Sequence, residues 1–220
     1  MDFSFNLDQF LALLQDYNVG IWPLQVIAYA LGIAALSLAV RKTKYSGSVI
    51  MAILAFFWLW TGGVFNLIYF RPFYPLAIVF AVLFVVQGTI FALAALGKPK
   101  ISFQLKADLP SLIAIVLALY ALVGYPLLET LWGRGYPRSL AFGLVPCPTT
   151  LFTLAIFLLA DKKLPWYAVA IPVFYSFGGI VPVASGIYED IGLVGGGVFT
   201  FIFLLIRNRT KREDDSVAFS

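Results

Sequence analysis

The fold class is decided by apolar runs such as residues 74–96, YPLAIVFAVLFVVQGTIFALAAL, which contain no Asp, Glu, Lys or Arg. A helix rises about 1.5 Å per residue, so about 20 apolar residues cross the roughly 30 Å hydrocarbon core of a bilayer. Hydrophobic residues make up 61% of the 220, charged residues only 12%, and the mean hydropathy is +0.93. A soluble domain could not solvate such a surface. The sequence therefore predicts an all-α integral membrane protein.

Six further stretches resemble this run in length and composition. The seven predicted spans cover roughly residues 20–40, 47–69, 74–96, 110–131, 140–160, 165–186 and 190–206. The fifth and seventh are the most interrupted by Pro or Gly. We expect seven transmembrane helices that together form one domain over residues 20–206.

The basic residues alternate between the two sides of these spans. Twelve of the 15 follow spans one, three, five and seven: Arg41, Lys42, Lys44, Lys98, Lys100, Lys106, Lys162, Lys163, Arg207, Arg209, Lys211 and Arg212. Because Lys and Arg remain cytoplasmic, the N-terminus is expected outside and the C-terminus inside. The net charge of +4 then reflects topology and contact with the lipid bilayer, and it gives no indication of nucleic acid binding.

Two polar segments flank this domain. In residues 1–19 the apolar side chains recur at helical spacing, at Leu7, Phe10, Leu11 and Leu14. This pattern predicts an amphipathic N-terminal helix on the outer interface, acting either as an anchor or as a gating lid. The segment has no Lys or Arg, so it does not read as a cleavable signal peptide. Residues 207–220 are predicted to be a polar cytoplasmic tail.

The composition excludes several kinds of site. There is no His, and Cys147 is the only Cys, which rules out a disulfide within one chain, His-ligated zinc or haem, and a Ser-His-Asp triad. No charged residue falls near a predicted midplane, which argues against a carboxylate there that drives proton-coupled transport. We therefore expect no cofactor, no metal site and no enzymatic activity.

The first and fifth spans begin alike, with Gly20-Ile21-Trp22-Pro23 and Gly143-Leu144-Val145-Pro146, and each ends in a basic pair. The second and sixth spans share an aromatic segment that ends in Gly-Gly. These matches suggest two repeats, 20–96 and 140–206, that are parallel because one linker helix, 110–131, separates them. Such a 3+1+3 arrangement is known among transporters. Chance similarity of Gly, Pro and aromatic residues is the alternative.

The most unusual string in the chain is Pro146-Cys147-Pro148-Thr149-Thr150. Each proline removes a backbone donor and clashes with the preceding turn, so the fifth helix should break or kink here. Thr149 or Thr150 is expected to cap the freed backbone groups. The restarted helix would point its positive end toward the outer half, where it would attract anions or carbonyl oxygens.

Other helix-breaking residues lie at a similar predicted depth. The hinge and helix-break positions are Pro23, Gly62, Gly63, Pro126, Pro146, Pro148, Gly178 and Gly179. Polar side chains near them form the predicted solute-binding set: Gln25, Asn66, Cys147, Thr149, Thr150, Tyr175 and Ser176. A cavity that opens outward would explain non-helical backbone at this depth, and packing of kinked helices against small residues would explain it without a ligand.

A further set of charges belongs to the outer rim of the predicted bundle. Its members are Arg71, Glu129, Arg134, Arg138, Glu189 and Asp190. The simplest interpretation is that these side chains are solvated at the interface, where ion pairs contribute little. The alternative is a rim that attracts or orients a polar solute.

Several motifs together resemble a bacterial family of multi-pass membrane proteins. They are Tyr17-Asn18, Trp22-Pro23-Leu24-Gln25, Trp58-Leu59-Trp60, Gly124-Tyr125-Pro126-Leu127, Phe142-Gly143 and Pro146-Cys147-Pro148-Thr149-Thr150. The resemblance extends over nearly the whole chain, and its Pro-Cys-Pro-Thr string is the most specific part. That family has no established function, so the resemblance implies the fold and a place in the bacterial inner (plasma) membrane. A weaker similarity to SWEET transporters rests on architecture alone.

The preferred functional hypothesis is a transporter or channel for an unknown small solute, with its site in the outer half of the bundle. The alternative is a non-transporting scaffold or sensor subunit, and a lipid-modifying membrane enzyme is a third possibility. A homo-oligomer is compatible with each of them.

Overall fold

The computed structural model describes residues 6–97 and 101–217, with side chains up to Arg207. Within these residues the regular elements are helical, and a single isolated bridge joins Phe103 to Ala160. In chain order they are α1 (Leu7–Gly20), α2 (Leu24–Val40), α3 (Ser46–Trp60), η1 (Thr61–Phe70), α4 (Arg71–Phe73), α5 (Ala77–Leu96), α6 (Leu109–Leu119), η2 (Tyr120–Gly124), α7 (Tyr125–Leu131), α8 (Pro146–Leu158), α9 (Trp166–Phe177), α10 (Ile180–Ala184), η3 (Tyr188–Asp190) and α11 (Ile191–Val217).

Several of these elements join into segments long and apolar enough to cross a membrane. In the described part of the chain there are five: Ser46–Phe73, Ala77–Leu96, Leu109–Leu131, Trp166–Ala184 and Tyr188–Arg207. The first and third continue through the π-helical turns η1 and η2 without a break in the chain direction. The expectation of all-helical structure is confirmed, and five of the seven predicted spans have a continuous counterpart.

The other two predicted spans, 20–40 and 140–160, differ from expectation in a related way. α1 and α2 meet at a bend of 85° near Pro23, so they form at most one broken span. α8 has 13 residues, which is too short to cross a bilayer as a helix. In both places the helix begins at or just after a proline, because proline cannot donate the backbone hydrogen bond that would extend a helix backward.

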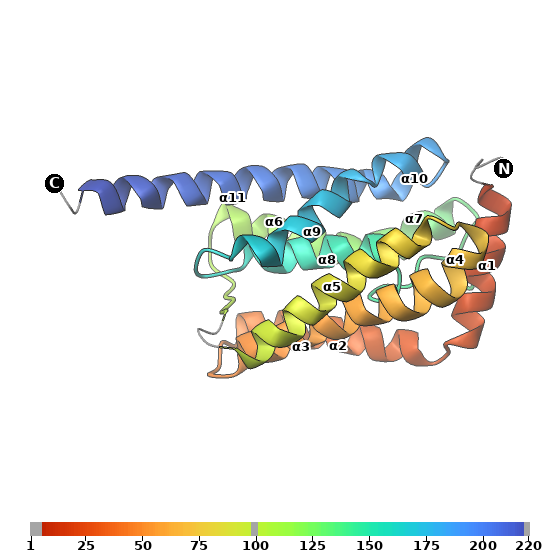
Figure 1. Cartoon of the computed structure of the whole chain (residues 1–220), viewed down its shortest axis with the longest axis horizontal. Helices are drawn as coiled ribbons and strands as arrows, with labels where there is room; N and C mark the ends of the chain where they lie inside the picture. Colours follow the sequence, from red (N-terminus) through yellow and green to blue (C-terminus); the bar gives the residue numbers. More distant parts are fainter. Residues whose placement is uncertain (1–5, 98–100, 218–220) are drawn as a thin grey trace.

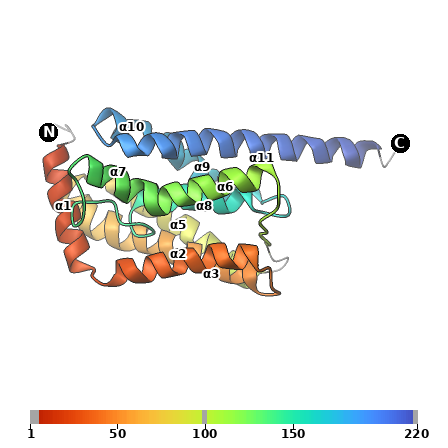
Figure 2. The same ribbon diagram turned by 180° about the vertical axis from the view of Figure 1, so that it is seen from behind.

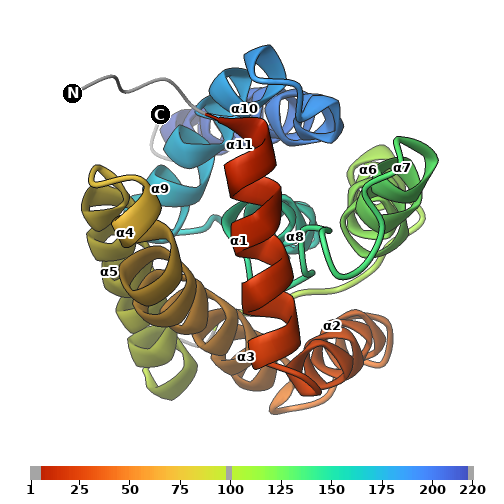
Figure 3. The ribbon, with the colours of Figure 1, turned by 90° about the vertical axis from the view of Figure 1, so that its right-hand side faces the viewer.

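Helix α1 lies across one end of the bundle, in front of α8 when the molecule is viewed from that side (Figure 3). Asn6 caps its first turn by accepting from the Gln9 N–H at 3.1 Å. Phe10, Leu14 and Tyr17 are buried against the bundle, so the predicted amphipathic helix is present and its apolar face packs on the other helices. We call this end of the molecule the α1 end.

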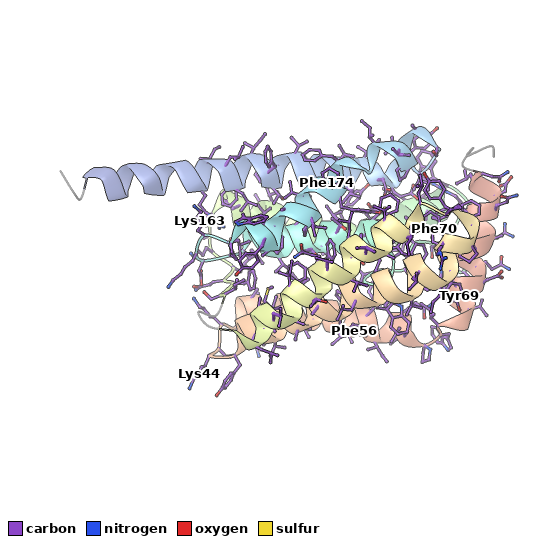
Figure 4. The ribbon with its side chains drawn as sticks, in the orientation of Figure 1. Lys44, Phe56, Tyr69, Phe70, Lys163 and Phe174 are labelled. Atoms are coloured by element: carbon purple, nitrogen blue, oxygen red, sulfur yellow. The ribbon has the colours of Figure 1, made fainter. Side chains whose placement is uncertain are left out.

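The opposite end carries exposed lysines, and we call it the basic end. Lys44 and Lys163 lie there, whereas Tyr69 and Phe70 lie near α1 (Figure 4). Helix α11 runs beyond the bundle at this end (Figure 1). Residues 207–217 therefore continue a helix, although a separate polar tail was predicted. Lys98 and Lys100 lie outside the described residues, as do the side chains of Arg209, Lys211 and Arg212.

Helix α8 occupies the centre of the molecule, with α6, α9 and α11 against it (Figures 1 and 2). Residues 139–160 are all buried, so the central helix is covered on every side. Its aromatic residues continue into the surrounding core, where Phe152 packs edge-on against Phe142 at 5.1 Å between ring centroids. The outer surface of the surrounding helices is rich in exposed Val, Leu, Ile and Phe. That distribution is the one expected where lipid is the solvent.

Helix α5 approaches α3 and η1 closely through glycines. A Cβ at Gly88 would lie 2.9 Å from the Leu59 backbone nitrogen, and one at Gly62 would lie 2.9 Å from the Val85 nitrogen. Small residues at such crossings allow dispersion contacts between backbones, which drive helix association where lipid replaces water. Beside this crossing Trp58 stacks on Phe84 at 4.2 Å.

Candidate functional site

The candidate site lies at the start of the central helix. α8 begins at Pro146, and residues 140–145, which lead into it from the α1 end, are non-helical and buried. The chain thus enters the bundle in turns, with the Leu144 and Val145 N–H groups both bonded to the Ala141 carbonyl, and becomes helical inside it. Of the first four residues of α8, Pro146 and Pro148 have no N–H, which leaves the N–H groups of Cys147 and Thr149.

Two fully buried hydroxyls follow the prolines. Thr149 and Thr150 are both 0% exposed, and neither Oγ1 atom has a hydrogen-bond partner among the described residues. Val145 precedes the helix and offers no side-chain cap. The expectation that Thr149 or Thr150 caps the freed backbone groups is therefore wrong, because both lie inside the first turns rather than before them. Their hydroxyls are available to another polar group.

One turn deeper, Thr153 connects α8 to α3. Its Oγ1 accepts a hydrogen bond of 2.8 Å from Trp58 Nε1 and donates to the Thr149 carbonyl at 2.8 Å. Helices α3 and α8 run in opposite directions. One helical turn from this contact toward the α1 end, the chain continuing from α3 has Thr61 and α8 has Thr149. The Thr61 hydroxyl is also buried and unpartnered among the described residues. The two free hydroxyls therefore lie at one depth.

Cys147 lies beside an acidic residue. Asp190, 0% exposed, accepts a hydrogen bond of 2.8 Å from the Tyr125 hydroxyl through Oδ1. Its second oxygen, Oδ2, has no nitrogen or oxygen donor within the described residues, and the carboxyl interacts with the Cys147 thiol. Tyr175 approaches the same thiol from α9. Four elements, α7, α8, α9 and η3, thus contribute one residue each.

The neighbouring Glu189 forms a buried ion pair. Arg134 Nη2 donates to Glu189 Oε2 at 2.8 Å, with the two side chains 10% and 1% exposed. The Arg134 Nη1 also donates to the Gly186 carbonyl at 3.4 Å. The Tyr120 hydroxyl donates to the Glu189 carbonyl at 2.9 Å. One element, η2, and one connecting segment therefore hold Glu189 in place.

Glu129 completes the group. Its Oε1 accepts from the Leu140 backbone N–H at 2.7 Å, while Oε2 is buried without a partner among the described residues. Glu129, Glu189 and Asp190 are thus three buried carboxyl groups with one buried guanidinium, that of Arg134. We call these four residues the buried charge group. Charges in such surroundings are costly and usually mark function.

The interpretation of the rim as solvated is therefore wrong for the buried charge group. Arg71 and Arg138 are exposed, as a rim residue should be, but the other four are buried. The reason lies in segment 132–145 and η3, which fold back over the bundle instead of projecting from it. Sequence reasoning placed these residues at span ends correctly and missed the covering chain.

Helix α1 is tied directly to the segment that leads into α8. The Tyr17 hydroxyl donates to the Leu144 carbonyl at 2.7 Å and accepts from Trp60 Nε1 at 3.0 Å. Asn18 Nδ2 donates to the Pro137 and Ser139 carbonyls, both at 2.7 Å. α1 therefore holds the non-helical entry to α8 in its position.

The remaining predicted solute-binding residues lie around this region. Gln25 Nε2 donates to the Asn18 carbonyl at 2.7 Å, and Asn66 Nδ2 donates to the Thr61 carbonyl at 3.1 Å, so each bonds to a nearby part of its own segment. Ser176 donates to Val173 O at 2.6 Å and faces Gly197 on α11. The structure brings Cys147 and Tyr175 together. Gln25 lies apart from these two residues and is bonded to α1.

The predicted hinge residues lie at changes of helix type or direction. Pro23 lies at the α1–α2 bend, Gly62 and Gly63 begin η1, Pro126 follows η2, Pro146 and Pro148 begin α8, and Gly178 and Gly179 separate α9 from α10. Two cavities, of about 940 and 430 Å³, are lined by none of the seven predicted solute-binding residues. Six of those seven residues are buried, and Tyr175 is partly exposed.

Sequence reasoning also missed several residues of this site. Neither Tyr125 nor Thr61 was predicted as a site residue, although each stands beside a predicted hinge, at Pro126 and at Gly62. Tyr17, Asn18 and Tyr125 were noted only as parts of family motifs. These residues could have been identified from the sequence because each has a hydrogen-bonding side chain close to a predicted helix break.

The basic end has a more exposed charge group. Asp161 pairs with Lys42 and Lys106 and accepts from the Ser102 hydroxyl at 2.9 Å. Partial desolvation raises the pKa of Asp161, but the hydrogen bonds from Lys42, Ser102 and Lys106 outweigh it and hold the pKa below its usual 3.8. Asp161 is therefore ionised at neutral pH.

A family model described as "Family of unknown function (DUF6064)" matches residues 7–215. The chain belongs to this family. The match begins at the first residue of α1, so the helix that covers the entry to α8 belongs to the same family unit as the bundle. The expectation of a family without established function is confirmed. Neither a curated protein nor a solved structure matches the chain.

Proposed function

We propose that this DUF6064 protein is a small-solute transporter or channel of the bacterial inner membrane. The observation that carries the proposal is the central helix α8, which starts inside the bundle at Pro146 beside buried, unpartnered hydroxyls. In transporters, discontinuous helices of this kind place free backbone and side-chain groups at the substrate. Non-helical backbone at membrane depth needs such protein surroundings.

The proposed topology has seven crossings, with the α1 end outside. Segment 140–145 and α8 together make the fifth crossing, since the helix alone is too short. Lys42, Lys44, Lys162 and Lys163 would then face the cytoplasm at the basic end, in agreement with the positive-inside rule. α1 would lie at the outer interface, over the entry to α8.

A parallel repeat is consistent with the helix contacts. α3 packs between α2 and α5, and α9 packs against both α8 and α11, so the middle helix of each triplet touches the other two. Segment Leu109–Leu131 separates the triplets and would reverse the direction once. We propose the 3+1+3 architecture on these grounds, and the likeness to SWEET transporters concerns architecture only.

The charges favour a neutral polar or cationic solute over an anion. Only two of the first four residues of α8 have an N–H, which weakens the anion attraction of its N-terminus. Asp190 adjoins the same turn, and the buried charge group has three carboxyls for one guanidinium. A bound cation or proton would balance that excess. In the described residues no group of carboxylates, Cys or His is arranged to hold a metal ion.

Uptake into proteoliposomes tests the proposal. Purified protein is reconstituted and screened with labelled sugars, polyols, amino acids and amines, and we expect flux for a neutral or cationic member. Thr149→Val with Thr150→Val should weaken that uptake about fivefold, because one hydrogen bond to a solute is worth about 1 kcal/mol. Thr89→Val is the matched control, since its hydroxyl is exposed and bonds only to Val85 O.

Cys147 provides a second, independent measurement because the chain contains no other Cys. A membrane-impermeant thiol reagent added from outside should modify Cys147 slowly in the closed state, and faster when a transported solute opens the site. Flux for no solute, with Cys147 protected under every condition, would overturn the proposal.

The second candidate is a scaffold or sensor subunit. The observation in its favour is the burial of six of the seven predicted solute-binding residues, none of which lines either of the two cavities. It predicts protection of Cys147 together with co-purification of a defined protein partner. The transporter predicts flux from the purified chain alone.

A further inference from the structure

A groove of about 940 Å³ opens at the basic end between α5, α9 and the segment that precedes α9. Its walls are mainly apolar, with Leu93 from α5, Val169 from α9 and Leu204 from α11. The groove therefore continues the apolar outer surface of the bundle inward. It is remote from α8's first turn, so the solute site proposed above does not account for it.

The mouth of this groove is basic and aromatic. Lys162 and Lys163 line it, and both are exposed. Neither forms an ion pair within the described residues, because the nearby Asp161 is bound by two other lysines. Trp166, also at the mouth, is 78% exposed. Trp beside Lys at the end of an apolar helix is typical of the membrane–water interface.

A guanidinium stands next to the same segment. Arg207 Nη1 donates to the Ala160 carbonyl at 2.9 Å, while Nε and Nη2 are buried and have no partner in the described part of the chain. Arg207 is one turn along α11 from the groove-lining Leu204. Buried guanidinium donors require an acceptor, and phosphate oxygens match the fork geometry of arginine.

We propose that this groove binds an anionic glycerophospholipid of the cytoplasmic leaflet. An acyl chain lies against Leu93, Val169 and Leu204, and the phosphate is held by Lys162 and Lys163 with Arg207 beside them. A basic pocket between helices on this side of a membrane is suited to such headgroups. A soluble phosphate would use the charges and leave the apolar walls uncovered. The inference rests on the membrane placement proposed above and is independent of transport.

Native mass spectrometry of the full chain tests the site. The protein is released from vesicles of phosphatidylcholine mixed with phosphatidylglycerol, and the lipids that remain bound are identified. We expect retained phosphatidylglycerol and no comparable retention of phosphatidylcholine. Lys163→Gln should reduce retention about fivefold, the effect of one basic residue near an anionic surface.

Lys44→Gln is the matched control, because Lys44 is an exposed lysine at the same end and does not line the groove (Figure 4). It should leave retention unchanged. Equal losses for the two variants would show attraction to surface charge only and would overturn the proposal. Val169→Phe, which narrows the groove and keeps every charge, should also reduce retention.

Inorganic phosphate separates the headgroup from the lipid. Failure of inorganic phosphate to displace phosphatidylglycerol is the expected result, since the acyl chain contributes to binding. Full displacement, or retention unaffected by Val169→Phe, would overturn the lipid assignment in favour of a simple anion site. Retention of a second copy of the chain in place of a lipid would overturn the lipid assignment in favour of a dimer interface. Solute flux measured in parallel distinguishes failure here from failure of the transporter proposal.

Discussion

The two ends of the bundle hold acidic and basic side chains in opposite circumstances. At the α1 end the Arg134 and Glu189 side chains are 10% and 1% exposed, and Asp190 and Glu129 are buried as well. At the basic end Lys42 and Lys106 are 41% and 49% exposed around Asp161. The same chemical groups therefore meet a low dielectric at one end and water at the other.

This difference shows at which end of the molecule charged groups lower the stability of the fold. An exposed ion pair contributes about 0–1 kcal/mol, whereas a buried pair is expensive to desolvate and often less stable than an apolar replacement. The exposed group at the basic end needs no explanation beyond solubility and topology. The buried charge group has an excess of carboxyls, which gives no stability advantage and is consistent with the ligand that we propose.

The largest expected effect comes from breaking the buried pair on one side. Arg134→Met leaves Glu189 buried without its cation and should cost about 3–5 kcal/mol of unfolding free energy. Denaturant titration in detergent micelles measures the loss. Arg138→Met is the control, because Arg138 is exposed and bonds to Gln15. Similar losses for the two variants would remove the contrast between buried and exposed charge.

Removing both partners should largely restore stability. In the double variant Arg134→Met with Glu189→Met no charge of the pair remains buried, so we expect an unfolding free energy within about 1–2 kcal/mol of the wild type. Solute uptake should remain impaired despite the recovered fold. A double variant as unstable as Arg134→Met alone would contradict the proposed origin of the loss.

A smaller effect is expected for the hydrogen bond to Asp190. Tyr125→Phe removes the donor to Oδ1 and leaves a buried acceptor unpaired, at a cost of about 1–3 kcal/mol. Tyr136→Phe, at a 59% exposed residue, should change stability by less than about 0.5 kcal/mol. Thermal unfolding of both variants decides the point, and indistinguishable midpoints would argue against the buried bond.

The smallest effect concerns the basic end and depends on pH. The pKa of Asp161 is lowered in the folded state, so its contribution is complete above its usual value of 3.8 and is lost as pH falls through the lowered pKa. Asp161→Asn should cost about 0–1 kcal/mol at neutral pH and nothing in strong acid. Added salt should reduce the difference. If the unfolding free energies of wild type and variant differed more in acid than at neutral pH, the pKa of Asp161 would not be lowered by folding.

The sequence predicted the helical character and most segment limits because hydropathy responds to length and composition alone. Residues 47–69, 74–96 and 110–131 have counterparts in Ser46–Phe73, Ala77–Leu96 and Leu109–Leu131. The prolines at 146 and 148 indicated a helix break, which the structure turns into the start of α8. Hydropathy and proline positions therefore predict the features that depend only on nearby residues, namely helix length and helix breaks.

The buried charge group could not be predicted in the same way. Glu129, Arg134 and Glu189 lie in or beside connecting segments, and a connecting segment is usually exposed. Their burial depends on segment 132–145 folding inward and on α1 crossing above it, which are long-range contacts. Hydropathy contains no information about such contacts, so exposure was the default expectation and it failed here.

The sharp bend after α1 has a practical consequence for how the protein can be assembled. α1 is fastened to the far part of the chain by Tyr17 and Asn18, and Phe10 and Leu14 are buried beneath it. Trp22 in the connection is 61% exposed, so an interruption of the chain there would disturb few buried contacts. A molecule cut there would keep its first helix by non-covalent contacts. The first helix and the remaining chain could then be supplied as two polypeptides that complement one another, much as split proteins do.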